Sequence, residues 1–169
     1  MKTLETKRLI LRDWEITDLD DAFLFWSNPN VTVPEGSTPR KSKEECLPIL
    51  KYLINAKNNY ALVLKETGRV LGSVGINEDA VGNENARNLG FLLAEFYWNQ
   101  GLMSEALEKI ISVANEITPM LSATHNISNV KSEHILKKFG FKYVKTIKNI
   151  QRKVDVAPHD EPYYILEIR

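Results

Sequence analysis

The strongest constraint on the fold is a stretch in which an apolar strand pattern leads through a glycine turn into an amphipathic helix. Residues 88–93 are mostly aliphatic or aromatic and predict a buried strand. Gly101 closes the following turn, and apolar side chains then recur at helical spacing from Leu102 to Ile117. The first N–H groups of a helix lack intrahelical partners and lie at the positive end of its dipole. The junction therefore predicts an anion site suited to a pyrophosphate, although an isolated Gly101 is also typical of an ordinary turn.

The remaining segments predict one mixed sheet with helices on it. Further strands are expected at residues 6–14, 60–64, 69–76, 121–125, 141–146 and 163–168. Helices are expected after Thr17, near Ser42 and from Asn129, with an irregular loop at 28–40 and a turn at 158–162. We expect a single α+β domain over residues 1–169, in three layers, with six to seven strands in a twisted sheet and about four helices.

Composition excludes several functional classes. The formal net charge of zero gives the chain no overall attraction to nucleic acid or to an anionic membrane. No signal-peptide pattern and no apolar run long enough to span a bilayer is present, and the lone Cys46 excludes an internal disulfide, so we expect a cytoplasmic protein. The three histidines are too scattered for a metal-ligand pattern, and we expect no metal.

Residues 97–106 read Tyr-Trp-Asn-Gln-Gly-Leu-Met-Ser-Glu-Ala. This run resembles the coenzyme A pyrophosphate loop of the GNAT superfamily of N-acetyltransferases, in the form found in the RimJ/RimL-like ribosomal-protein acetyltransferases. A second block at 129–141, with Asn129, Ser132 and Gly140-Phe141, resembles the same family, as do residues 4–12 and Asn28-Pro29. The resemblance covers essentially the whole chain.

The resemblance implies a GNAT fold and an enzyme that moves the acetyl group of acetyl-CoA directly to an amine. It favours a protein or peptide N-terminus as the acceptor. A small-molecule amine, such as a polyamine, amino acid or aminoglycoside, stays open, and carboxylates around the acceptor loop would favour it. A non-catalytic acyl-CoA-binding module is the alternative from another class. The chain would act as a monomer or a homodimer.

The same resemblance assigns the cofactor site. The backbone of Phe91, Leu92 and Leu93 would hold the pantetheine arm, with an amide such as that of Leu93 stabilising the oxyanion. Asn129 would bind the cofactor near its pantetheine portion, unless it is simply a helix cap, and Ser132 would assist the departing thiolate, unless its hydroxyl is merely solvated. The amides of the turn and of the first helical turn would cradle the diphosphate: Asn99, Gln100, Gly101, Leu102, Met103 and Ser104.

The general base is less defined by the sequence. Many relatives have a glutamate where this chain has Asn88. An ammonium acceptor must lose a proton before it attacks, so another group has to take that proton. Glu84 is our candidate from the residues nearby, with Asp79, Glu95, His125 and a relayed water as open alternatives.

Overall fold

One mixed sheet of eight strands runs through residues 1–151 and 157–168, the part of the chain that the computed structural model describes. The strand order is β1-β2-β3-β4-β5-β6-β8-β7, and the pair β5 and β6 is parallel while the other neighbours are antiparallel. The strands are β1 (Leu4–Glu5), β2 (Leu9–Arg12), β3 (Asn59–Leu64), β4 (Val70–Glu78), β5 (Ala86–Leu93), β6 (Met120–Thr124), β7 (Lys142–Ile150) and β8 (His159–Glu167).

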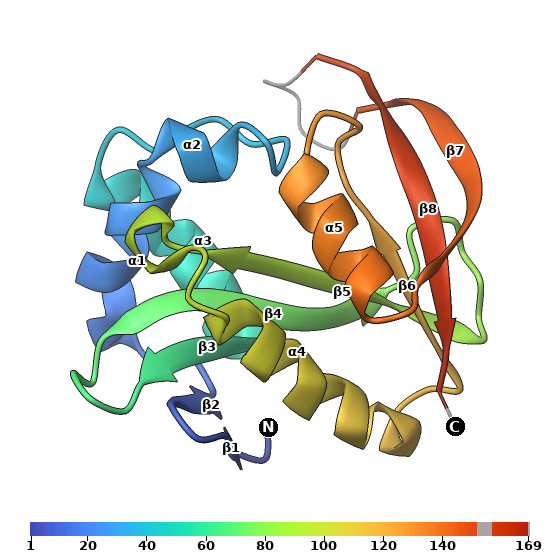
Figure 1. The fold of residues 1–169 in the computed structure, drawn as a ribbon. Helices are drawn as coiled ribbons and strands as arrows, with labels where there is room; N and C mark the ends of the chain where they lie inside the picture. The colour runs from blue at the N-terminus through green and yellow to red at the C-terminus, as the bar shows by residue number, and fades with distance from the viewer. Residues whose placement is uncertain (152–156, 169) are drawn as a thin grey trace.

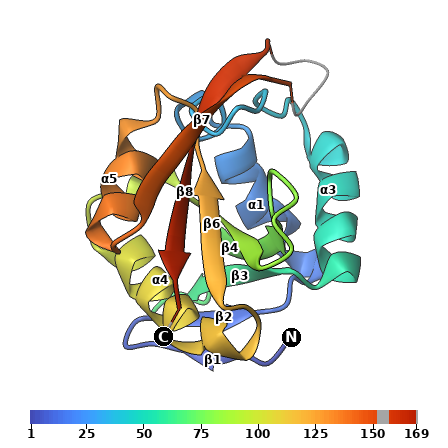
Figure 2. The same ribbon diagram turned by 90° about the vertical axis from the view of Figure 1, so that its right-hand side faces the viewer.

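Helices cover both faces of the sheet, with α4 and α5 on one side and α1 and α3 on the other (Figure 2). The α-helices are α1 (Leu19–Trp26), α2 (Pro29–Thr32), α3 (Lys43–Ala56), α4 (Leu102–Val113) and α5 (Val130–Lys138). Short 3-10 turns are η1 (Ile16–Asp18), η2 (Glu95–Tyr97) and η3 (Ala114–Glu116). No helix in the described part of the chain is both long and apolar enough to cross a membrane. The predicted three-layer α+β architecture is confirmed, with one strand and one helix more than expected.

The extra strand, the two-residue β1, and the extra helix, the four-residue α2, are too short to show in the sequence pattern. The expected loop after Asn28 contains α2, because Pro29 occupies the first helical position and the Asn28 side chain accepts a hydrogen bond from the amide of Asn30. The expected turn at 158–162 is instead the start of β8. The β6 ladder ends opposite Tyr163, so Pro162 lies outside it and its missing N–H removes no bond there.

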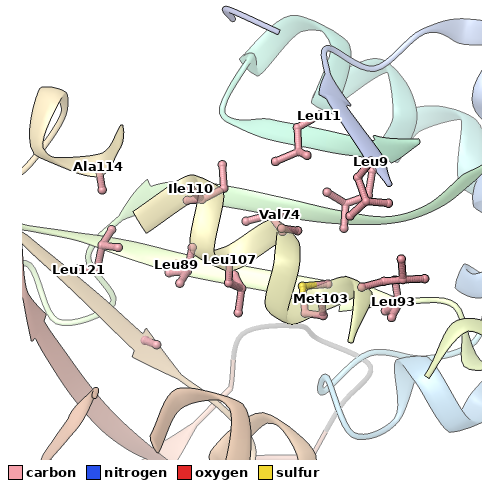
Figure 3. Close-up of a cluster of buried hydrophobic side chains, with 14 of the residues drawn as sticks. Leu9, Leu11, Val74, Leu89, Leu93, Met103, Leu107, Ile110, Ala114 and Leu121 are labelled. Carbon is pink, nitrogen blue, oxygen red and sulfur yellow. The ribbon is translucent and has the colours of Figure 1, made fainter. Parts of the chain in front are cut away.

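The core between α4 and the sheet fixes where α4 begins. Met103, Leu107 and Ile110 point from α4 toward Val74 and Leu89 of the sheet (Figure 3), and all five side chains are at most 5% exposed. Burying a side chain of this size contributes about 2 kcal/mol. The first turn of α4 is therefore held against the end of β5.

Candidate active site

The two parallel strands separate in the middle of the sheet. β5 pairs with β6 only from Ala86 to Asn88, after which the β6 ladder continues with β8 alone. β5 and β6 run in different directions from this point (Figure 1). A cavity of about 1320 Å³ lies where they part, lined by residues of β5, α4 and α5. Beyond Asn88, this edge of β5 has no strand partner among residues 1–151 and 157–168.

The free edge of β5 presents main-chain groups to this cavity. The amide of Ala94 donates to the carbonyl of Leu71 on β4, so by alternation Leu92 also faces β4 while Phe91 and Leu93 face the gap. The carbonyl of Leu93 accepts the indole N–H of Trp98 at 2.7 Å. The amide of Leu93 and both main-chain groups of Phe91 are thus placed for a ligand lying along the strand.

The turn before α4 uses left-handed backbone at two positions. Asn99 and Gly101 have φ of 60° and 74°, and the helix begins at Leu102 directly afterward. The amides of the first helical turn have no intrahelical acceptor, and they border the cavity. The side chain of Met103 is buried in the core, so it points away from the cavity that its backbone borders.

A polar clamp holds the turn from the other side. The carboxylate of Glu105 accepts hydrogen bonds from Thr6 Oγ1 at 2.6 Å, from the amide of Arg8 at 2.7 Å and from Arg8 Nε at 2.7 Å. Arg8 Nη1 also donates to the carbonyl of Gln100 at 2.9 Å. Burial acts to raise the pKa of Glu105, but these hydrogen bonds outweigh it and the pKa is lowered. The first hairpin therefore fixes the loop.

Helix α5 closes the cavity opposite β5. Asn129 caps the helix by accepting from the amide of Ser132 at 3.1 Å, and its Nδ2 donates to the carbonyl of Pro34 at 3.2 Å. Ser132 borders the cavity, and its hydroxyl forms no hydrogen bond within residues 1–151 and 157–168. Lys138 Nζ donates to Ser104 Oγ at 3.0 Å and brings a positive charge to the start of α4.

The structure brings most of the residues singled out from the sequence to this one cavity. Its lining includes Phe91, Leu92, Leu93, Asn99, Gly101, Leu102, Met103, Ser104, Asn129 and Ser132. Gln100 and Glu84 are not part of the lining. The side chain of Gln100 donates to the carbonyl of Phe96, and Glu84 is exposed in the loop between β4 and β5.

The other base candidates differ in their surroundings. Asp79 lies outside the cavity lining and accepts hydrogen bonds from Tyr163 and from two loop amides. Glu95 borders the cavity, but its carboxylate accepts from the side chains of Asn28 and Asn30. His125 is 7% exposed, and its Nδ1 lies 2.8 Å from the carbonyl of Asn126.

Sequence reasoning missed a carboxylate that the fold brings to the cavity. Glu161 on β8 is 4% exposed, borders the cavity and lies 3.1 Å from His159 Nε2. Reading residues 158–162 as a strand would have placed Glu161 on the same face as Tyr163, two residues on. Among the described residues, no three His, Cys, Asp or Glu side chains form a group that could hold a metal ion.

The splayed strands, the glycine turn and the helix start define an acyl-CoA-binding transferase fold. The profile of the acetyltransferase (GNAT) domain matches residues 8–142. The chain belongs to this family. Membership confirms an acetyl-CoA-dependent acyltransferase, with acetyl-CoA as co-substrate.

Individual relatives agree with this assignment. The chain is similar to the uncharacterized N-acetyltransferase p20 of Bacillus licheniformis, with 32% identity over 117 residues, 66% of this chain and 65% of that protein. A GNAT-family acetyltransferase from Bacillus anthracis has the same fold, with a TM-score of 0.85, 19% identity and 98% of each chain covered. An acetyl transferase from Salmonella typhimurium that modifies the N-terminal serine of ribosomal protein L7/L12 also has this fold. Its TM-score is 0.80 at 16% identity, and the match covers 99% of this chain and 100% of that chain.

Proposed function

We propose that the protein transfers the acetyl group of acetyl-CoA to the amine at the N-terminus of a protein or peptide. The observation that carries the transfer itself is the unpaired edge of β5, where the Leu93 amide faces the cavity beside the start of α4. An amide fixed at the point where negative charge develops stabilises the tetrahedral intermediate by a few kcal/mol.

The protein contributes to the remaining steps mainly by orienting the two substrates. The amides from Asn99 to Ser104 hold the diphosphate at the positive end of α4, and Lys138 adds a positive charge there. The main chain of Phe91 pairs with the pantetheine arm. Ser132, on the opposite wall of the cavity, donates its hydroxyl hydrogen to the thiolate that leaves. With both substrates held together, the amine attacks the thioester carbon directly.

The peptide acceptor rests on likeness to the RimJ/RimL-like enzymes. The loop sequence at 97–106 resembles theirs, and the Salmonella typhimurium protein of the same fold modifies an N-terminal serine. Residues of α2, of the loop after it and of the start of α5 border the cavity, and an extended chain end would reach β5 between them.

A cationic small-molecule amine is the second candidate, and a specific feature favours it. Three carboxylates border the cavity in the described residues: Glu35, Glu95 and Glu161. These carboxylates would attract a cationic amine such as a polyamine or an aminoglycoside to the cavity.

The test is an acceptor screen with acetyl-CoA. Release of free coenzyme A is measured with tetrapeptides that begin with serine or alanine and with spermidine, and products are identified by mass spectrometry. Acetylation at the peptide α-amine supports the proposal. Turnover confined to spermidine replaces it with the second candidate, and coenzyme A binding without turnover on any amine supports a non-catalytic module.

A further inference from the structure

Glu161 differs from the other two carboxylates on the cavity wall. Glu35 and Glu95 are exposed. Glu161 is 4% exposed. A carboxylate taken out of water to this degree interacts strongly with any cation that enters its neighbourhood.

The strand register puts Glu161 on the face of the sheet opposite α4. Tyr164 belongs to the core under α4, so Tyr163 and Glu161 project from the other face. By the same alternation Val74 and Leu89 face α4, whereas Ser73 and Asn88 face the side of Glu161. The cavity thus reaches through the gap between β5 and β6 from one face to the other.

That second face is polar and uncrowded next to the free edge of β5. Ser73, Asn77 and Asn88 border the cavity there. Gly90 lies among them, and the nearest heavy atom to an added Cβ would be Asn77 Nδ2 at 3.9 Å. A small polar group can therefore approach β5 from this side, while the diphosphate end of the cavity lies on the α4 side.

His159 orients the Glu161 carboxylate. His159 Nε2 lies 3.1 Å from Glu161 Oε1 and donates to it when Nε2 carries hydrogen, while Nδ1 lies 3.2 Å from the carbonyl oxygen of Ala157. The ring is held by its surroundings, since a Cβ at Gly36 would lie only 3.3 Å from His159 Cε1. The loop after α2 therefore packs on His159, and Asn129 holds the same loop through Pro34.

We propose that Glu161 binds the ammonium group of the acceptor and takes its proton before attack. This inference rests on the proposed acetyl transfer and names the base for it. The ammonium gives one proton to the Glu161 carboxylate, and the freed nitrogen lone pair forms the bond to the thioester carbon. The C–S bond then breaks, the Ser132 hydroxyl protonates the departing sulfur, the second proton of the nitrogen restores that hydroxyl, and Glu161 returns its own proton to solvent.

Other charged and titratable groups lie around Glu161 on each neighbouring element. On the strands they are His159 and Tyr163 of β8 and Lys145 of β7. In the loops they are Asp79 after β4, which accepts a hydrogen bond from Tyr163, Glu35 after α2 and His125 after β6. A pH profile of a Glu161 variant must therefore be compared with that of wild type, because these groups titrate in both proteins.

The test compares Glu161→Gln with Glu167→Gln, a matched change at an exposed position on the same strand. The glutamine keeps an oxygen acceptor for His159 but loses the negative charge. Coenzyme A release is measured with a serine-initiated tetrapeptide and with spermidine across pH 6 to 10. Calorimetry measures coenzyme A binding and then binding of both amines to the coenzyme A complex.

We expect kcat/KM to fall about a hundredfold in Glu161→Gln near pH 7, with the Kd for coenzyme A unchanged. The loss should shrink as pH rises toward the pKa of the amine, where free amine no longer needs a base. Wild-type rates in Glu161→Gln on an amine that wild type acetylates would overturn the inference and leave the proposed function intact.

Binding and turnover separate the two proposals. Amine binding that depends on Glu161, without turnover in wild type, would support the ammonium site and overturn the proposed function. Neither binding nor turnover of either amine in wild type would overturn both.

Discussion

The indole N–H of Trp98 donates to the main-chain carbonyl of Leu93, with 2.7 Å between the nitrogen and the oxygen. The amide of Leu93 faces the cavity on the same side as this carbonyl. Trp98 therefore orients the peptide plane next to the position at which an oxyanion would develop. Lys131 Nζ, 3.4 Å above the Trp98 ring, holds the indole in place.

Trp98→Phe removes this hydrogen bond while keeping an aromatic ring under Lys131. We expect kcat to fall about tenfold, equivalent to about 1.4 kcal/mol, while KM for acetyl-CoA changes less. Steady-state kinetics measure the split. Trp26→Phe is the control for loss of indole packing, because Trp26 belongs to the buried core under α1 and α3, against which the half-buried Trp98 also packs. An equal loss of kcat in both variants would contradict the prediction.

Gly101→Ala should weaken coenzyme A binding. Gly101 has φ of 74°, and an alanine there costs about 1–2 kcal/mol because left-handed backbone is unfavourable for a residue with a Cβ. An added Cβ would lie 3.6 Å from Arg8 Nη2, so strain rather than a clash causes the effect. We expect the Kd for coenzyme A, measured by calorimetry, to rise about tenfold.

Gly68→Ala is the matched control for this change. Gly68 has φ of 70° in the turn between β3 and β4, with no atom within 4 Å of an added Cβ. Both variants should lose similar unfolding free energy, but Gly68→Ala should bind coenzyme A as wild type does. Unchanged affinity in Gly101→Ala would refute the assignment of the diphosphate to this turn.

The sequence predicted those elements whose ends are marked by local chemistry. Helix α4 begins after Gly101 as expected, because a left-handed glycine and the amphipathic pattern mark the same position. The start of β8 was predicted wrongly, because Pro158 and Pro162 are typical of a turn and the pairing that extends this strand comes from distant β7. Long-range pairing overrides local propensity here.

The two halves of the candidate site also differ in how far the sequence predicts them. Most of the proposed cofactor side consists of main-chain groups next to a helix start, and a single continuous stretch from Phe91 to Ser104 supplies them. The proposed acceptor side combines Glu161 of β8 with Asn77 of β4 and Glu35 of a loop. Their proximity follows from the strand order β5-β6-β8, which no short-range pattern encodes.

The role of Asn129 can be tested with a variant that removes one of its two hydrogen bonds and keeps the other. Asn129→Asp keeps the oxygen that caps α5 but loses the Nδ2 donor to Pro34. We expect its unfolding free energy to stay close to wild type, whereas Asn129→Ala should lose about 1 kcal/mol. The KM for the acceptor should rise severalfold in Asn129→Asp, because the loop that carries Glu35 is released. A higher Kd for coenzyme A with an unchanged acceptor KM would instead assign Asn129 to the cofactor.

Glu105→Gln should destabilise the protein in a pH-dependent manner. The hydrogen bonds from Thr6 and Arg8 lower the pKa of Glu105 in the folded state despite its burial, so ionised Glu105 favours folding. Hydrogen bonds to a charged group contribute about 1.5–3 kcal/mol, and we expect a loss of about 2 kcal/mol in unfolding free energy at pH 7. Chemical denaturation at several pH values measures this difference.

The sign of the pH dependence follows from the direction of the shift. A carboxyl with a lowered folded-state pKa stabilises the protein fully above its unfolded pKa, about 4.3, and loses this contribution as pH falls through the folded value. The difference between wild type and Glu105→Gln should therefore be constant from pH 6 to 8 and shrink below about pH 4. Glu108→Gln, an exposed change on the same helix, should show little difference at any pH. If the deficit of Glu105→Gln were as large at pH 3 as at pH 7, the ionised clamp between Glu105 and Arg8 would not be what holds the loop before α4.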